Sequence, residues 1–219
     1  MEFIAVRGLD SASPANVHEH LLRARSKELS DSIDVAIEDV RKSYAEREIV
    51  SITISLNDTA MRRWSVWLYG QPFHKGSENL DRVVVDICEI HQFSMRGGDH
   101  ECANACIDTI REIIAHDYDK LTVDLGTFLH FLAAEPKAVQ MLVDLLVYGP
   151  TARSGKTREW LYGTRAEEKW VHFFHQLSLT SAKRLADEAA LHPDIMAQHA
   201  YHIADKDTGT CCGATSGVV

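Results

Sequence analysis

The stretch VHEHLLRARS, from Val17 to Ser26, is among the most informative parts of this sequence about its fold. Leu21, Leu22 and Arg25 recur in it at helical spacing, so one face of a helix can be buried while the charges face water. The spacing predicts a helix that begins near His18, at the end of a short apolar segment. Ser26 then marks a break after which a second helix can start.

A second stretch, WSVWLYG over residues 64–70, lies about forty residues further along. It follows an apolar segment at 49–55 that predicts a strand, and Asn57 and Asp58 stand between the two as candidate helix caps. Gly70 and Pro72 are typical of the end of a helix. The buried face expected for this helix contains Ala60, Met61, Trp64 and Leu68.

The order of these segments resembles the BTB/POZ domain. In that family a strand precedes a V-H-x-x-L-L-x-x-x-S pattern, and a later strand precedes a helix that ends in a W/L-Y-x-G-like turn. The matching residues are Val17, His18, Leu21, Leu22, Ser26, Leu68, Tyr69 and, one place early, Gly70. Segments 80–93 and 102–113 resemble the two helices that follow in the family. The resemblance covers residues 1–118.

Residues 119–204 resemble the helical extension of the BTB-like proteins common in filamentous fungi. The similar segments are 137–147, 158–161, 170–177 and the pair Tyr201-His202. We expect this extension to pack on the first domain and residues 205–219, rich in glycine, threonine and serine, to form a disordered tail. Two segments depart from the family pattern: the loop at 9–16 and the charged, insertion-like stretch at 31–47.

The expected fold class is therefore α+β, a small BTB/POZ-like sheet flanked by helices and followed by a mainly helical C-terminal extension. Strands are predicted near 3–6, 15–17 and 49–55. Helices are predicted from His18, Asp31, Asp58, Glu78, Asp99, Val123 and Pro136, with a break at Gly97-Gly98.

Composition and charge favour a protein-binding role over several others. The net charge of -9 argues against nucleic acid as a partner, because phosphate binding needs clustered cations. We expect Arg23 with Arg25, and Arg62 with Arg63, on solvated helix faces. No apolar run approaches the ~20 residues that span a bilayer, so no membrane partner is expected. The acidic N-terminus and five cysteines without paired spacing predict an intracellular protein, cytoplasmic or nuclear.

Three motifs suggest chemistry, and a structural explanation is preferred for each. The segment 149–157 resembles a phosphate-binding loop, but it has one residue too many between its glycines and follows a predicted helix. Cys102 and Cys106 lie one helical turn apart, yet a zinc site needs four ligands, so core cysteines are expected. His172 and His175 are expected at a core boundary, and Cys88 in an apolar helix as an unreactive thiol.

The resemblance implies protein–protein interaction without catalysis, and the sequence indicates no catalytic residue, cofactor or metal. Such domains often self-associate through the first strand and first helix. The expected partner-binding residues of a homodimer are Phe3, Val6, His20, Leu21 and Arg23. One alternative is an adaptor for a cullin-type ubiquitin ligase, bound by the helices at 58–69 and 78–93. Another is a small metal-dependent hydrolytic enzyme that uses histidines and acidic residues.

Overall fold

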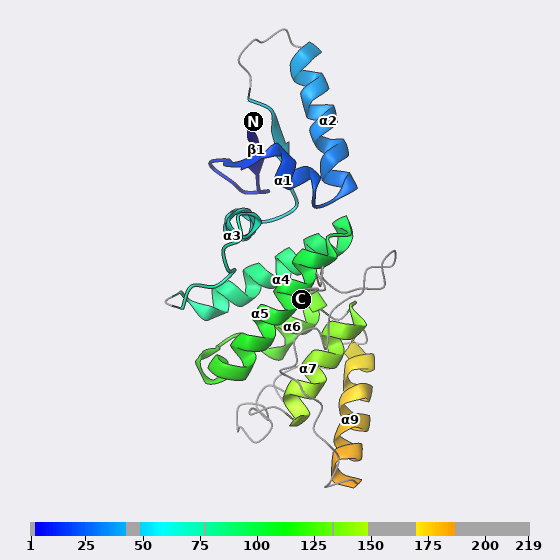
Figure 1. Ribbon diagram of the computed structural model, residues 1–219. Coiled ribbons are helices and arrows are strands. Elements are labelled where there is room, and N and C mark those ends of the chain that lie inside the picture. Colours follow the sequence, from blue (N-terminus) through cyan, green and yellow to red (C-terminus); the bar gives the residue numbers. More distant parts are fainter. Residues whose placement is uncertain (1–2, 43–48, 77, 133, 149–169, 187–219) are drawn as a thin grey trace, which may run out of the picture.

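The computed structural model describes residues 3–42, 49–76, 78–132, 134–148 and 170–186. It is an α+β fold in which helices greatly outnumber strands. One end holds the sheet with the first two helices, the middle holds α4 to α7, and the other end holds α9 (Figure 1).

The sheet consists of β1 (Phe3–Arg7), β2 (Ala15–His18) and β3 (Ser51–Thr53) in the order β2-β1-β3. β1 pairs with β2 in antiparallel orientation and with β3 in parallel orientation. The central strand has buried residues at Ile4, Ala5 and Val6, as expected for an apolar strand covered by helices. β3 lies at one edge of this sheet, and two helices connect β2 to β3 along the chain.

Those helices are α1 (Glu19–Arg23) and α2 (Lys27–Lys42). The hydroxyl of Ser26 accepts a hydrogen bond from the backbone N–H of Leu29 at 3.1 Å, which is an N-cap interaction. The break predicted at Ser26 is confirmed. The helix start predicted at Asp31 is wrong by four residues, because Ser26 and not Asp31 caps the helix.

Helix α3 (Asp58–Leu68) forms the bridge between the sheet and the helical part of the molecule. The Asn57 side chain accepts a hydrogen bond from the Ala60 N–H at 2.9 Å, which confirms the predicted cap. Gly70 has a φ of 75°, a left-handed conformation that favours glycine, and it directly follows the helix end.

An antiparallel helix pair, α4 (Leu80–Gly97) and α5 (His100–Asp117), follows. The predicted break is confirmed by Gly98, which has a φ of 75° and ends α4. Asp99 then caps α5, because its side chain accepts a hydrogen bond from the Cys102 N–H at 3.1 Å. Among the described elements, these two helices make the most extensive contact.

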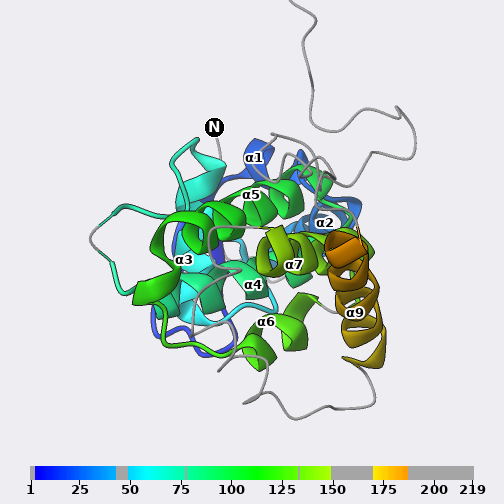
Figure 2. The same cartoon turned by 90° about the horizontal axis from the view of Figure 1, so that it is seen from below.

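The extension begins with a short 3-10 helix (Tyr118–Lys120) and continues with α6 (Leu125–Leu132), α7 (Pro136–Tyr148) and α9 (Val171–Ala186). α6 contacts α4, and α7 contacts α5, so the extension packs on the helix pair. In Figure 2, α9 lies on the outer side of α7, away from α4 and α5.

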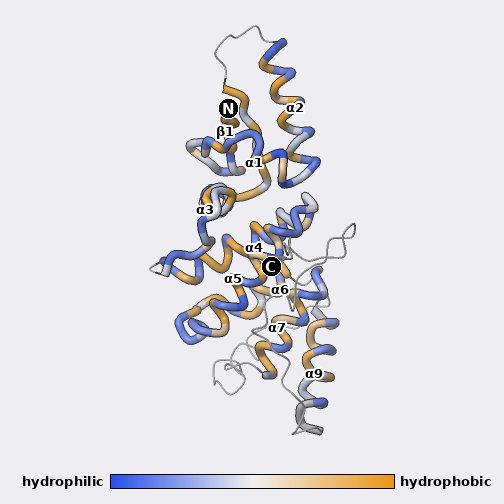
Figure 3. Tube along the Cα trace, in the orientation of Figure 1, coloured by the Kyte–Doolittle hydropathy of each residue, from blue (hydrophilic) through white to orange (hydrophobic). Residues whose placement is uncertain are grey.

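A single hydrophobic cluster runs from Ile4 in the first strand to Phe173 in the last helix. Its largest fully buried side chain is Trp64 of α3, whose ring meets Phe93 of α4 edge-on at 5.4 Å between centroids. Hydrophilic residues prevail along α2, whereas hydrophobic and hydrophilic residues alternate along α4 and α5 (Figure 3). One continuous core thus joins the two parts that the sequence divides near residue 118.

Several expectations lie outside the described residues: the loop at 149–157, the segments at 158–161 and 201–202, and the tail at 205–219. Met141–Tyr148, just before the loop, is helical as predicted. Among the described helices, none is long and apolar enough to cross a membrane.

Candidate interaction surface

Four rings, from β1, β2, α1 and the C-terminal end of α3, form a cluster at the surface, which we call the aromatic surface: Phe3, His18, His20 and Tyr69. The His18 ring lies at its centre, 4.1 Å from the Phe3 centroid, 5.6 Å from that of His20 and 5.6 Å from that of Tyr69. Phe3 is 50% exposed and Tyr69 is 45% exposed. Aromatic side chains that are this open are typical of interaction sites, because they offer a large contact area with little conformational freedom to lose.

The sheet register and the end of α3 create this cluster. Phe3 and His18 are paired residues of β1 and β2, so their side chains share one face of the sheet. Tyr69 reaches them from the C-terminus of α3. Its hydroxyl accepts a hydrogen bond from the His18 backbone N–H at 3.1 Å, and it lies 2.8 Å from His18 Nδ1. Val66, one turn before Tyr69, is 40% exposed and extends the apolar area along α3.

The five predicted partner-binding residues lie in different environments, and only some of them are on the surface. Phe3 and His20 belong to the aromatic surface. Val6 is fully buried, because it lies three residues from Phe3 on a strand and therefore faces the opposite side. Including Val6 in a partner surface is therefore wrong.

Leu21 and Arg23 also serve the fold. Leu21 is partly buried against the core. The Arg23 guanidinium lies 2.7 Å from Glu19 and 2.8 Å from Asp34, and it donates to the Ser30 hydroxyl at 3.0 Å. These carboxylates raise the pKa of Arg23 above its ordinary value. Arg23 thus holds α1 to α2.

The prediction from sequence missed His18, Val66 and Tyr69 as surface residues. His18 and Tyr69 were recognised only as members of the family pattern. A signal existed at Val66, because it does not fit the buried face of α3 formed by Met61, Trp64 and Leu68. Nothing in a single sequence indicates that residues 51 positions apart share a hydrogen bond.

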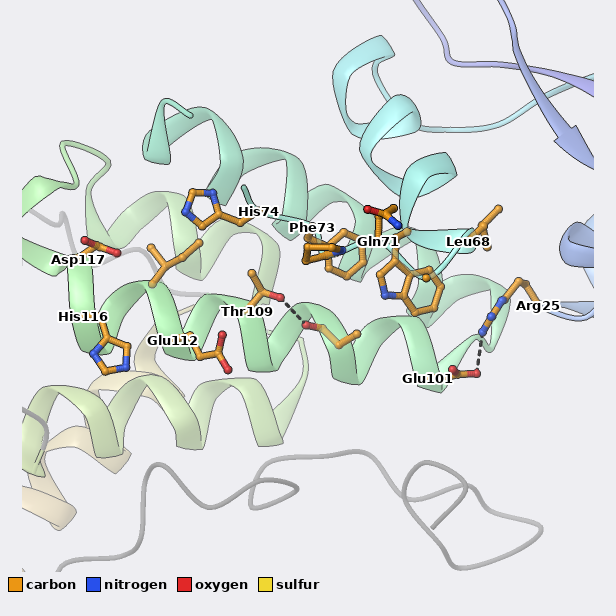
Figure 4. Close-up of a pocket in the computed structure, with 15 residues that line it drawn as sticks. Arg25, Leu68, Gln71, Phe73, His74, Glu101, Thr109, Glu112, His116 and Asp117 are labelled. Atoms are coloured by element: carbon orange, nitrogen blue, oxygen red, sulfur yellow. Dashed lines mark hydrogen bonds and ion pairs between the residues drawn. The ribbon is translucent and has the colours of Figure 1, made fainter. Parts of the chain in front are cut away.

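A groove of about 640 Å³ runs along α5 and is closed at one end by Arg25 (Figure 4). The Arg25 guanidinium carbon lies 4.7 Å from the centre of the Trp67 ring, and the Phe73 ring stacks on Trp67 at 5.4 Å and 4°. Arg25 also pairs with Glu101 of α5 at 2.7 Å. The groove is lined further along by Gln71, His74, Thr109, Glu112, His116 and Asp117.

The environment of Arg25 corrects one expectation. Its side chain is only 18% exposed, so it does not lie on a solvated helix face. The same holds for Arg63, which is 15% exposed and pairs with Glu78 at 2.7 Å. Arg62, in contrast, is exposed and pairs only with Asp58 of its own helix.

Replacing Arg25 by alanine is expected to lower the free energy of unfolding by about 1–2 kcal/mol, because the contact with Trp67 is partly desolvated. Arg25→Lys should recover only part of this loss, since an ammonium lacks the planar stacking group. Urea unfolding measures both variants. Glu101→Ala is the matched control; Glu101 is 64% exposed, so its loss should cost under about 0.5 kcal/mol. An Arg25→Ala effect no larger than the control would contradict the stacking role.

The cysteines of the described region are structural. Cys88, Cys102 and Cys106 are all buried and unpaired, as expected. Burial raises the pKa of Cys88 and of Cys106, so neither forms a reactive thiolate. Within the described ranges, no group of three or more His, Cys, Asp or Glu side chains is arranged to hold a metal ion.

In the aromatic helix α9, the two histidines do not lie where the sequence predicts. Trp170 and Phe173 are buried, but His172 and His175 are both exposed. α9 contacts α7, and the two histidines lie on a part of α9 that remains open to solvent. Their predicted role at a core boundary is wrong.

Comparisons with protein-family models, with curated proteins and with solved structures find no match for this chain. Any function must therefore be argued from the surfaces of the molecule itself.

Proposed function

We propose that this chain is a protein–protein interaction module of the BTB/POZ type that forms a homodimer through the aromatic surface. The observation that carries the proposal is the cluster of Phe3, His18, His20 and Tyr69, in which three exposed rings surround the half-buried His18. A compact, rigid set of rings rimmed by polar groups has the composition of an interface centre.

The order of elements supports the family part of the proposal. β1 comes first, and the V-H-x-x-L-L-x-x-x-S pattern then spans β2, α1 and the cap of α2. β3 and α3 follow, and α3 ends at Leu68-Tyr69-Gly70 before the α4–α5 pair. This is the order that the resemblance implies.

The position of the surface supports self-association. In a two-fold symmetric dimer the same patch meets its own copy, so an aromatic cluster can bury itself without a different complementary partner. The rings are fixed by the register of β1 and β2 and by the Tyr69 hydrogen bond, so little conformational entropy is lost on contact.

Light scattering coupled to size-exclusion chromatography tests the dimer. The wild-type chain is expected at twice 24.6 kDa, and a Phe3→Asp, Val66→Asp double variant at 24.6 kDa. The physical reason is that two copies would then bury four unpaired carboxylates at the centre of the interface. Both positions are at least 40% exposed, so the monomer should still fold.

Leu179→Asp is the matched control for this experiment. Leu179 is 50% exposed on α9, far along the molecule from the aromatic surface, and its replacement should leave the mass unchanged. A monomeric wild type, or a double variant that remains dimeric, would refute the assignment of this surface.

A further inference from the structure

A second surface lies at the other edge of the sheet, where β3 runs beside α2 (Figure 1). A groove of about 730 Å³ separates the two elements, and β3 contributes Ser51, Ile52 and Thr53 to it. Because β3 is an edge strand, one side of its backbone is hydrogen-bonded to β1, and no described strand pairs with the other side. We call this the α2–β3 groove.

The register shows which backbone groups point into solvent. Val50 and Ile54 bond to β1 at 2.9 Å each, so the N–H and C=O groups of Ser51 and Thr53 face away from β1. No hydrogen bond to another described residue satisfies them. Both residues are exposed. An unpaired edge of this kind is a template for an added strand.

The α2 side of the groove carries unbalanced negative charge. Glu28, Asp31 and Asp39 line it, and none of them makes an ion pair with a described residue. Lys27 is the one cation among the described lining residues. The neighbouring acids on other faces of α2 are neutralised, since Asp34 pairs with Arg23 and Glu38 with Lys42.

At one end the groove opens into a smaller pocket of about 180 Å³, with which it shares Glu28, Ser32 and Thr53. The apolar walls of this pocket are Leu29, Ile54 and Phe93. The volume corresponds to about six water molecules at about 30 Å³ each, enough for one long side chain.

Two buried polar groups that line this pocket lack partners. The Ser94 hydroxyl belongs to a residue that is 1% exposed, and Oδ2 of Asp99 to one that is 8% exposed; neither atom has a hydrogen-bond partner among the described residues. The nearest cation to Asp99 is Arg25, at 4.0 Å from the other oxygen. Burial raises the pKa of Asp99, which means that the surrounding groups do not fully stabilise its charged form.

We propose that the α2–β3 groove binds an extended basic segment of a partner protein, which adds a strand to β3 and inserts one lysine or arginine side chain into the pocket at Asp99. The apolar walls would contact the aliphatic stem of that side chain, and its charged head would lie beside the carboxyl group of Asp99. The groove carboxylates would then face the remaining cations of the segment.

A second copy of this chain suits the groove less well. Pairing two β3 edges would bring both sets of carboxylates together, and like charges at close range oppose association. A basic partner relieves this repulsion, so charge complementarity favours it. The inference goes beyond the proposed dimer, because the aromatic surface contributes no residue to this groove.

Fluorescence anisotropy on the full chain tests the proposal with a fluorescein-labelled peptide of alternating lysine and threonine, about eight residues long. Saturable binding with a Kd in the range of about 1–100 μM is expected, weaker at high salt. A peptide with glutamate in place of lysine should not bind. A lysine–threonine peptide N-methylated at alternate residues should not bind either, since it lacks the N–H donors of a strand.

Protein variants locate the binding. Asp99→Asn keeps the helix cap but removes the charge, and Thr53→Pro removes an outward N–H without touching the ladder to β1; each should weaken binding about tenfold. Asp39→Asn should weaken it about twofold. The matched control Glu38→Gln, next to it but outside the groove, should bind as wild type does.

Three results would overturn the inference: no saturable binding at millimolar peptide, equal binding of the N-methylated peptide, or a dimer that Thr53→Pro converts to monomer. The last would show that a second copy occupies the edge. If Thr53→Pro fails to fold, the N-methylated peptide tests the same hydrogen bonds on the wild-type chain. The Phe3→Asp, Val66→Asp variant should bind the peptide normally, so failure of the proposed dimer remains distinguishable.

Discussion

Replacing Asp86 by alanine is expected to lower the free energy of unfolding by about 2–3 kcal/mol, because the substitution removes the buried acceptor of the Thr59 hydroxyl and one of the two carboxylates that pair with the half-buried Arg63. Asp86 of α4 is fully buried. Its carboxylate accepts a hydrogen bond from Thr59 at 2.7 Å and lies 3.3 Å from Arg82 and 3.4 Å from Arg63. Thr59 and Arg63 belong to α3, so this carboxylate fixes the helix that carries Val66 and leads to Tyr69.

Two further variants separate charge from shape in this network. Asp86→Asn keeps an acceptor for Thr59 but loses the ion pairs, so it should fall between the wild type and Asp86→Ala. Glu78→Ala removes the more exposed partner of Arg63 and should cost under about 1 kcal/mol. Urea unfolding at neutral pH measures all three. If Asp86→Ala lowers the free energy of unfolding by less than Glu78→Ala does, the network does not hold α3 in place.

The stability of the chain is expected to fall by about 3 kcal/mol between pH 6.5 and pH 4 through His91 alone. His91 of α4 is 1% exposed, and neither ring nitrogen has a hydrogen-bond partner in the described part of the chain. Burial lowers the pKa of His91 from 6.5 to about 4. Because the folded pKa lies below the unfolded one, the unfolded chain binds the proton first, and stability is full above pH 6.5 and declines as the pH falls toward 4.

The difference between wild type and His91→Leu isolates this contribution. Leucine does not titrate and has a similar size, so the variant should lose this part of the acid dependence and be at least as stable at neutral pH. Other groups titrate in the same range, and the raised pKa of Asp99 acts in the opposite direction. Subtracting the two urea-derived free energies at each pH cancels these effects. A difference that does not change with pH would contradict the assignment.

The buried position of His91 is visible in the sequence once α4 is accepted as a helix. Val84, Ile87, His91 and Ser94 recur at spacings of three and four residues, which place them on one face. All four are buried. The role of Asp86 is different, since its partners Thr59 and Arg63 come from another helix, and the expectation that Arg63 faces water was wrong.

Local signals in the sequence determined most element boundaries. Ser26, Asn57 and Asp99 cap helices through their own side chains, and Gly98 ends α4 because its backbone is left-handed. These interactions span no more than a few residues, so a single sequence contains them. The α+β class follows from the same local patterns.

Only the tertiary structure decided which residues are available to a partner. The parallel pairing of β1 with β3 leaves Ser51 and Thr53 at an open edge, and the register of β1 with β2 puts Phe3 beside His18 while Val6 enters the core. Tyr69 then joins His18 across 51 residues of chain. Such contacts depend on the register and packing of segments that are distant in the sequence. Local spacing does not specify them, because the interaction energies that fix the register arise only when the elements meet.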